Sequence, residues 1–279
     1  MDEKQLLERA LGLADEGDWE GMAVFLSENL SEHEEAPAVH CWLGVAEREL
    51  GLEGMAYERF KTALSLNPDD PYVLATAGSG IAAFDDPDAE VALRTAALTA
   101  PEIPLTRFLY GAYLAREGFA DQAQVELEAA RALDRDDAQI AFELGVARYL
   151  AADLDGAVDA MGDAVRLQPS DGWSRVVLGL TLLESDRLEE AVGELVEGAR
   201  SRPEDVSAQT LAALAAAVLG EEGIAYEMLE RGRMRAGEED IALVSLVEER
   251  VDSGPDSARR FLMGDMAPDE LRQRLQARP

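Results

Sequence analysis

Positive charge is scarce in this sequence of 279 residues, which contains only two lysines, Lys4 and Lys61. Lys and Arg together number 25 against 57 Asp and Glu, which gives a net charge of −32. A field of this sign repels the phosphates of nucleic acids and the anionic headgroups of membranes, so we expect neither as a partner. Two interpretations of the acidity stay open: adaptation to high intracellular salt, or a basic protein partner.

Cysteine and histidine are nearly absent. The single cysteine, Cys41, excludes an intrachain disulfide and is compatible with the cytoplasm, which is the location we predict. Cys41 directly follows His40, and neighbours on a helix point about 100° apart, so they form a poor nucleophile pair. The acids at Asp153-x-Asp155-Gly156 lack the spacing of a calcium loop, and the glycines occur singly rather than in a phosphate-binding loop. We therefore predict no enzyme activity, no cofactor and no metal site.

Long apolar runs are also missing. The longest, Leu211–Leu219, has nine residues, whereas a membrane span needs about 20. Met1–Gln5 is not a basic region followed by an apolar run, so we expect no signal peptide. Aromatic residues make up only 6%, and alanine and leucine fill most apolar positions. This composition suits closely packed helices.

A fixed step organises what is present. Gly111, Gly145 and Gly179 are 34 residues apart, and Ala123, Ala157, Ala191 and Ala225 keep the same step. Around Gly145 the chain reads as two short amphipathic helices joined by a turn at Asp153–Gly156. Gly145 allows the backbones of the two helices to approach, and Ala157 is expected at their closest contact. A step of this length indicates stacked repeats, because one hairpin cannot bury its apolar face alone.

The spacing resembles one family. Leu43-Gly44 is followed by Ala56-x3-Phe60-x2-Ala63-x4-Pro68, and Leu144-Gly145 by Ala157-x3-Met161-x2-Ala164-x4-Pro169. This pattern resembles the tetratricopeptide repeat, and the resemblance covers roughly residues 3–265. The position that is usually tryptophan in the family is occupied in this chain by His40, Leu74, Arg107, Ala141, Arg175 and Gln209. The resemblance implies an all-α fold, a right-handed α-solenoid of antiparallel helix hairpins forming a tetratricopeptide-like superhelix.

The repeat pattern divides the chain into three parts. Residues 1–36 are expected to be a divergent N-terminal capping repeat, 37–239 six tetratricopeptide-like repeats, and 240–279 a degenerate C-terminal hairpin and capping helix. The second repeat, 71–103, is one residue short, and we place the deletion in the turn Phe84–Pro87. The last helix is predicted over Pro268–Gln276, with proline in its first turn.

The resemblance implies that the first helix of each repeat lines a concave groove. Five aromatic side chains and one arginine fall on the corresponding positions: Tyr72, Phe108, Phe142, Tyr149, Trp173 and Arg48. The family's carboxylate clamp needs lysine, arginine and asparagine there, and only Arg48 fits by charge, so we do not predict capture of an acidic C-terminal tail. The aromatic residues are either anchors for a bound peptide or helix, or packing between neighbouring repeats.

We predict a non-enzymatic protein–protein interaction scaffold or adaptor that binds a peptide or helix, basic or with apolar anchors, in the concave groove. The alternative is a structural, self-assembling repeat protein, and an enzyme accessory subunit is not separable from the scaffold by sequence. The tail Leu271–Pro279 carries three arginines. It docks on an acidic surface of its own chain or of a second copy in a homodimer, or it is a frayed terminal helix.

Overall fold

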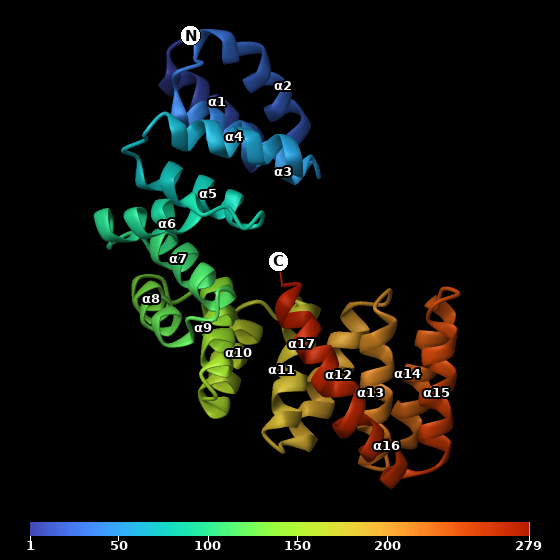
Figure 1. Ribbon diagram of the computed structural model, residues 1–279. Helices are drawn as coiled ribbons and strands as arrows, with labels where there is room; N and C mark the ends of the chain where they lie inside the picture. The colour runs from blue at the N-terminus through green and yellow to red at the C-terminus, as the bar shows by residue number, and fades with distance from the viewer. Residues whose placement is uncertain (279) are drawn as a thin grey trace. The chain divides into compact units, whose positions relative to one another are not determined.

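The computed structural model describes residues 1–278, and every regular element in this range is a helix (Figure 1). Consecutive helices pack as antiparallel hairpins, and within each of two parts of the chain the hairpins stack on their neighbours. The predicted all-α solenoid is thereby confirmed. The chain divides into two compact units, and we call residues 1–134 unit 1 and the residues from Arg135 onward unit 2.

Unit 1 contains eight α-helices and a short 3-10 turn. In chain order they are α1 (Glu3–Asp15), α2 (Trp19–Asn29), η1 (Leu30–Glu32), α3 (Pro37–Glu49), α4 (Glu53–Ser65), α5 (Pro71–Ala82), α6 (Asp88–Thr99), α7 (Pro104–Arg116) and α8 (Ala120–Leu133). The hairpins α3/α4, α5/α6 and α7/α8 fall in the predicted repeats 37–70, 71–103 and 104–137. We call α3, α5 and α7 the A helices of unit 1.

Unit 2 continues the hairpins and ends in a more irregular segment. Its elements are α9 (Ala138–Leu150), α10 (Leu154–Leu167), α11 (Gly172–Glu184), α12 (Leu188–Ser201), α13 (Val206–Val218), α14 (Glu222–Arg235), α15 (Ile241–Asp252), α16 (Pro255–Phe261), the π-helical turn η2 (Leu262–Met266) and α17 (Ala267–Gln276). The A helices of unit 2 are α9, α11 and α13. The three-part division of the chain stays our proposal. The last residue of the arginine-rich tail, Pro279, lies outside the described residues.

Aspartates begin all three A helices of unit 2. The side chain of Asp137 accepts from the backbone N–H of Gln139 at 2.7 Å, and Asp171 and Asp205 cap α11 and α13 in the same way. An aspartate N-cap satisfies an amide that has no partner inside the helix and favours the positive end of the helix dipole. These three turn aspartates therefore act as caps.

Small residues allow the two helices of a hairpin to touch. A β-carbon added to Gly145 of α9 would lie 2.5 Å from Cγ of Met161 on α10. Two non-bonded carbon atoms clash at this distance. Ala157 on α10 is fully buried, and its carbonyl oxygen would lie 3.2 Å from the same β-carbon. The 34-residue step thus marks the contact between paired helices, as the sequence predicts.

The two units differ in their cores. In unit 2 one continuous apolar cluster runs from Ala141 on α9 to Leu275 on α17. Unit 1 instead has one cluster around α1–α3 and a second around α3–α6. The A helices of unit 2 therefore share a core with the C-terminal helix.

Candidate functional site

The predicted groove residues of unit 1 lie on α3, α5 and α7. Tyr72, in the first turn of α5, exposes 48% of its surface, and its backbone N–H donates to Asp70 at 2.8 Å. Phe108 on α7 is half-buried. The guanidinium of Arg48 on α3 lies 3.6 Å from the carboxylate of Glu49 and 6.0 Å from the ring centre of Phe60. Tyr72 and Phe108 therefore offer accessible aromatic surface.

The predicted groove residues of unit 2 are more enclosed. Phe142 on α9 is only 8% exposed and belongs to the apolar core. Tyr149 and Trp173 are partly buried and pack against the same core. Burial raises the pKa of Tyr149 to about 12, and the charge and hydrogen bond of Glu184 act in the same direction. The packing interpretation is thus favoured for Phe142, whose role as an anchor remains a prediction.

The C-terminal helix lies against the A helices of unit 2. Helix α17 runs beside α11 (Figure 1). Its leucines at positions 271 and 275 are one turn apart, so they share one face, and both are buried in the core of unit 2. This is the behaviour expected of an amphipathic helix on an apolar surface. One of the two docking modes considered for the tail, docking on its own chain, is therefore present.

An ion pair with two hydrogen bonds joins α17 to α13. Arg274 Nη1 and Nη2 donate to the two carboxylate oxygens of Asp205 at 2.9 and 3.0 Å, and Arg274 Nε donates to Glu270 at 3.1 Å. Burial by itself would raise the pKa of Asp205, but the bonds and charge of Arg274, helped by the N–H of Ala208, outweigh it and lower that pKa. Both partners are largely shielded from water, which makes the pair sensitive to loss of either member.

Trp173 lies beside this ion pair. The guanidinium carbon of Arg274 is 5.2 Å from the Trp173 ring centre, and that of Arg202 is 5.6 Å away. A tryptophan ring attracts a cation placed over its face, more strongly where water is excluded. Trp173, which the sequence places in the groove, therefore contacts an arginine of α17.

A second arginine fixes the end of the tail. Arg278 Nε donates to both carboxylate oxygens of Glu143 on α9, at 2.9 and 3.2 Å, and the side chain of Glu143 is only 8% exposed. Arg278 also donates to the carbonyl oxygen of Leu275 in the last turn of α17. The two arginines thus connect α17 to α9 and α13.

The sequence pointed to the arginines of the tail but not to their acceptors. Asp205 has the same place in its repeat as Asp137 and Asp171, so nothing in its position marks it as a receptor. Glu143 lies inside an A helix next to the aromatic position 142. The signal in the sequence was that Glu143, a charged residue, stands between the apolar residues Phe142 and Leu144.

The cysteine has the properties of a packing residue. Cys41 is 1% exposed, and its Sγ lies 3.9 Å from the carbonyl oxygen of Val73. Burial, followed by the negative charge of Asp70, raises the pKa of the thiol to about 12. The adjacent His40 is engaged through Nε2 with the carbonyl oxygen of Glu34 at 2.9 Å. A thiol held protonated in this way is a poor nucleophile.

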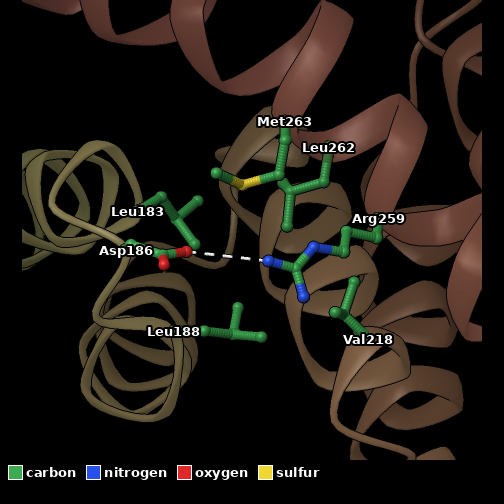
Figure 2. A pocket seen from close by; sticks show the side chains of 7 residues that line it. All are labelled: Leu183, Asp186, Leu188, Val218, Arg259, Leu262 and Met263. Atoms are coloured by element: carbon green, nitrogen blue, oxygen red, sulfur yellow. Dashed lines mark ion pairs between the residues drawn. The ribbon is translucent and has the colours of Figure 1, made fainter.

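A shallow pocket lies between the α11–α12 turn and the segment α16–η2 (Figure 2). Its free volume is about 10 Å³, room for roughly one water molecule and far too little for a small-molecule ligand. Asp186 and Arg259 face each other across it at 3.6 Å, and the other lining residues are apolar.

Within residues 1–278 no group of three or more Asp, Glu, His or Cys residues is placed to hold a metal ion. None of the helices in this range has both the length and the apolar character needed to cross a lipid bilayer.

No protein-family model and no curated protein sequence matches this chain. Several solved structures do. A chain of the APC/C hetero-tetramer Cut9–Hcn1 aligns with a TM-score of 0.67 and 19% identity, over 87% of this chain and 48% of that one. The C-terminal part of a TPR repeat-containing protein from Cytophaga hutchinsonii aligns with a TM-score of 0.55 and 13% identity, over 84% of this chain and 98% of that one. The chain has the tetratricopeptide-repeat fold.

A third structure agrees with this assignment. PilF of Pseudomonas aeruginosa aligns with a TM-score of 0.61 and 16% identity, over 76% of this chain and 98% of that one. At these identities the likeness concerns the fold. This chain spans about half the length of the Cut9–Hcn1 chain that it matches. The tetratricopeptide-repeat hairpins supply the A helices on which the predicted groove residues lie.

Proposed function

We propose that this tetratricopeptide-repeat chain is a non-enzymatic protein–protein interaction scaffold that binds a peptide or helix on its A helices. The observation that carries this proposal is α17, a helix held on the A helices of unit 2 by apolar and ionic contacts. The chain thus contains an example of the ligand class that such a face accepts. The Cut9–Hcn1 chain belongs to a hetero-tetramer, which is consistent with a role in protein assembly.

Unit 1 supplies the face on which the proposal is best tested. Within residues 1–134 no helix lies along the A helices as α17 does in unit 2. Tyr72 and Phe108 keep accessible ring surface there, with Arg48 on the neighbouring α3. Aromatic rings on rigid helices are effective anchors because little side-chain entropy is lost when they bind.

Affinity capture with paired variants tests the function. The double variant Tyr72→Ala and Phe108→Ala removes the two aromatic side chains predicted to line the groove in unit 1. The matched control, Val91→Ala and Leu98→Ala, removes two apolar side chains of α6 that are 66% and 69% exposed. We expect a partner captured by the native chain to be lost with the first variant and kept with the second. Equal recovery with both variants would contradict binding on the A helices of unit 1.

Self-association is the second candidate, and the surface of α6 favours it. Val91 and Leu98 are seven positions apart, so they share one helix face, and both are largely exposed. Sedimentation at increasing concentration tests this candidate. A mass that rises in the native chain and stays at that of a monomer in the Val91→Ala, Leu98→Ala variant would support assembly through α6.

A further inference from the structure

We infer that the surface beneath α17 is a binding site for an arginine-bearing amphipathic helix of another protein, and that α17 is its intramolecular occupant. We call this surface the α17 seat and define it by Glu143, Trp173 and Asp205 with the apolar core between them. The inference rests on the proposed function, because it names the partner chemistry of one A-helix face. It concerns unit 2 alone, so it can fail while binding on unit 1 stands.

The occupant defines the chemistry of the ligand. Leu271 and Leu275 supply an apolar stripe, and Arg274 and Arg278 repeat with the same four-residue step. Each arginine reaches a different carboxylate, Arg274 that of Asp205 and Arg278 that of Glu143. A matching ligand is therefore a helix of about three turns with the pattern Leu-x2-Arg-Leu-x2-Arg.

The seat is selective for arginine rather than for positive charge alone. Asp205 receives two parallel N–H donors from one guanidinium, an arrangement that a lysine ammonium does not provide. The same guanidinium lies over the ring of Trp173, which a planar cation covers better than a compact one. A ligand in which lysine replaces the first arginine is expected to bind less tightly.

Only one face of α17 is held. Leu271, Arg274 and Leu275 are buried, whereas Arg272 and Gln273 on the same helix are exposed. Arg272 pairs with Asp269 of its own helix at 2.9 Å. A helix held on one side can be replaced by another helix that presents the same side, provided that it competes with the high effective concentration of a tethered segment.

The charge of the chain favours a foreign ligand over a second copy. Two copies would each bring a net charge of −32, and this repulsion opposes exchange of α17 between them. A basic helix of another protein meets the opposite situation, since the same field attracts it. We therefore assign the seat to a helix from a different protein.

Binding of a labelled peptide tests the inference. The probe is a synthetic peptide with the sequence of residues 262–278, and the receptor is the full chain. The opened receptor carries Arg274→Ala and Arg278→Ala, which weaken the hold on α17 and leave the seat intact. We expect the opened receptor to bind the probe at least about tenfold more tightly than the native chain, because its tethered competitor is weakened.

Variants of the probe avoid any effect on receptor folding. A probe with Arg274→Ala or Arg274→Lys is expected to lose about tenfold or more in affinity for the opened receptor. A probe with Arg272→Ala, which changes the exposed arginine, is expected to bind as the native probe does. On the receptor side, Asp205→Asn is the matched test, because asparagine keeps the N-cap of α13 and removes the charge. It is expected to weaken the native probe to a similar extent.

Three results would overturn the inference. The first is an opened receptor that does not bind the probe. The second is equal affinity for the Arg274→Ala and Arg272→Ala probes, which would make the seat merely apolar. The third is an opened receptor that doubles its mass in sedimentation, which would assign the seat to a second copy. If the opened receptor has less helix than the native chain by circular dichroism, the single variant Arg278→Ala replaces it, with a smaller but still positive gain expected.

Discussion

Unit 1 and unit 2 are built from the same hairpin, but they differ in what lies on their A helices. In unit 2 the A helices carry α17, and one core cluster extends into that helix. In unit 1 the core is split in two, and Tyr72 on the A helix α5 is 48% exposed. Helix α17 thus extends the core of unit 2 over its A helices, and within residues 1–134 no helix does the same.

This difference predicts different stabilities for equivalent hairpins. In a solenoid each repeat contacts only its neighbours, so local stability depends on how much apolar surface those neighbours cover.

Trp173 is the one tryptophan of unit 2, whereas Trp19 and Trp42 both lie in unit 1. A chain with Trp19→Phe and Trp42→Phe therefore reports on the α17 seat alone, and the following experiments use this property.

The largest effect is expected from Arg274→Ala. The substitution leaves Asp205 without its bidentate partner in a site that is largely closed to water, and such a loss costs about 3 kcal/mol. Urea unfolding followed by Trp173 emission should show the loss of stability in unit 2. The matched control is Arg272→Ala on the exposed side of the same helix, with an expected change within about 0.5 kcal/mol. Equal losses for the two variants would mean that the ion pair contributes little.

Overpacking within a hairpin should cost slightly less. Ala157 in unit 2 and Ala123 in unit 1 hold the same repeat position, and both are fully buried. Leucine at either site has no room, so we expect a loss of about 1–3 kcal/mol and a lower thermal midpoint for each single variant. Calorimetry of Ala157→Leu and Ala123→Leu compares the units directly. An unchanged midpoint for Ala157→Leu would remove that residue from the helix contact.

Lowering the pH below about 4 should weaken the ion pair between Asp205 and Arg274 and so loosen α17 from the seat. The pKa of Asp205 in the folded chain lies below its ordinary value of 3.8, so the ionised carboxylate stabilises the fold above about pH 4. This contribution is lost as the pH falls through the lowered pKa. The effect should be smaller than that of Arg274→Ala, because a protonated carboxyl still accepts hydrogen bonds. Trp173 emission should shift in this range in the native seat and stay flat with Asp205→Asn.

The sequence was sufficient for the parts of the fold that repeat. The 34-residue step located Gly145 and Ala157 at the helix contact, and the proline at position 268 marked the start of α17 to within one residue. These features are local or recur in phase, so one chain displays them several times. The tetratricopeptide fold was predicted for this reason.

The position of α17 on the A helices of unit 2 could not be predicted from the repeat pattern. Arg274 and Asp205 are 69 positions apart. This pairing occurs once, so the repeat pattern contains no sign of it. Alignment to the repeat assigned Phe142 and Trp173 to A helices, on which they do lie, and their place in a groove stays a prediction. It carried no information on what packs above them: Trp173 lies beside Arg274 of α17, whereas Tyr72, at the same repeat position in unit 1, is 48% exposed.

Backbone conformation provides a smaller comparison between the units. The turn α7–α8 of unit 1 has Gly118 at φ 83°, whereas the turn α9–α10 of unit 2 has Ala152 at φ 62°. The left-handed region strains a residue with a β-carbon and leaves glycine free, so Ala152→Gly should stabilise unit 2 by about 1 kcal/mol. Gly118→Ala is the reciprocal variant and should destabilise unit 1 by a similar amount. Thermal midpoints that move in the same direction would contradict this account.

The smallest effect is expected from salt at the α17 seat. Raising KCl from about 0.01 to 1 M shortens the screening length from roughly 30 to 3 Å, which relieves the repulsion within a chain of net charge −32. The thermal midpoint of the whole chain should therefore rise if the acidity is an adaptation to salt. The pairs of Arg274 and Arg278 are largely buried, and buried pairs are screened much less, so Trp173 emission should hardly change. An emission shift at high salt without unfolding would mean that water enters the seat, and a midpoint that does not rise would favour a basic partner as the reason for the acidity.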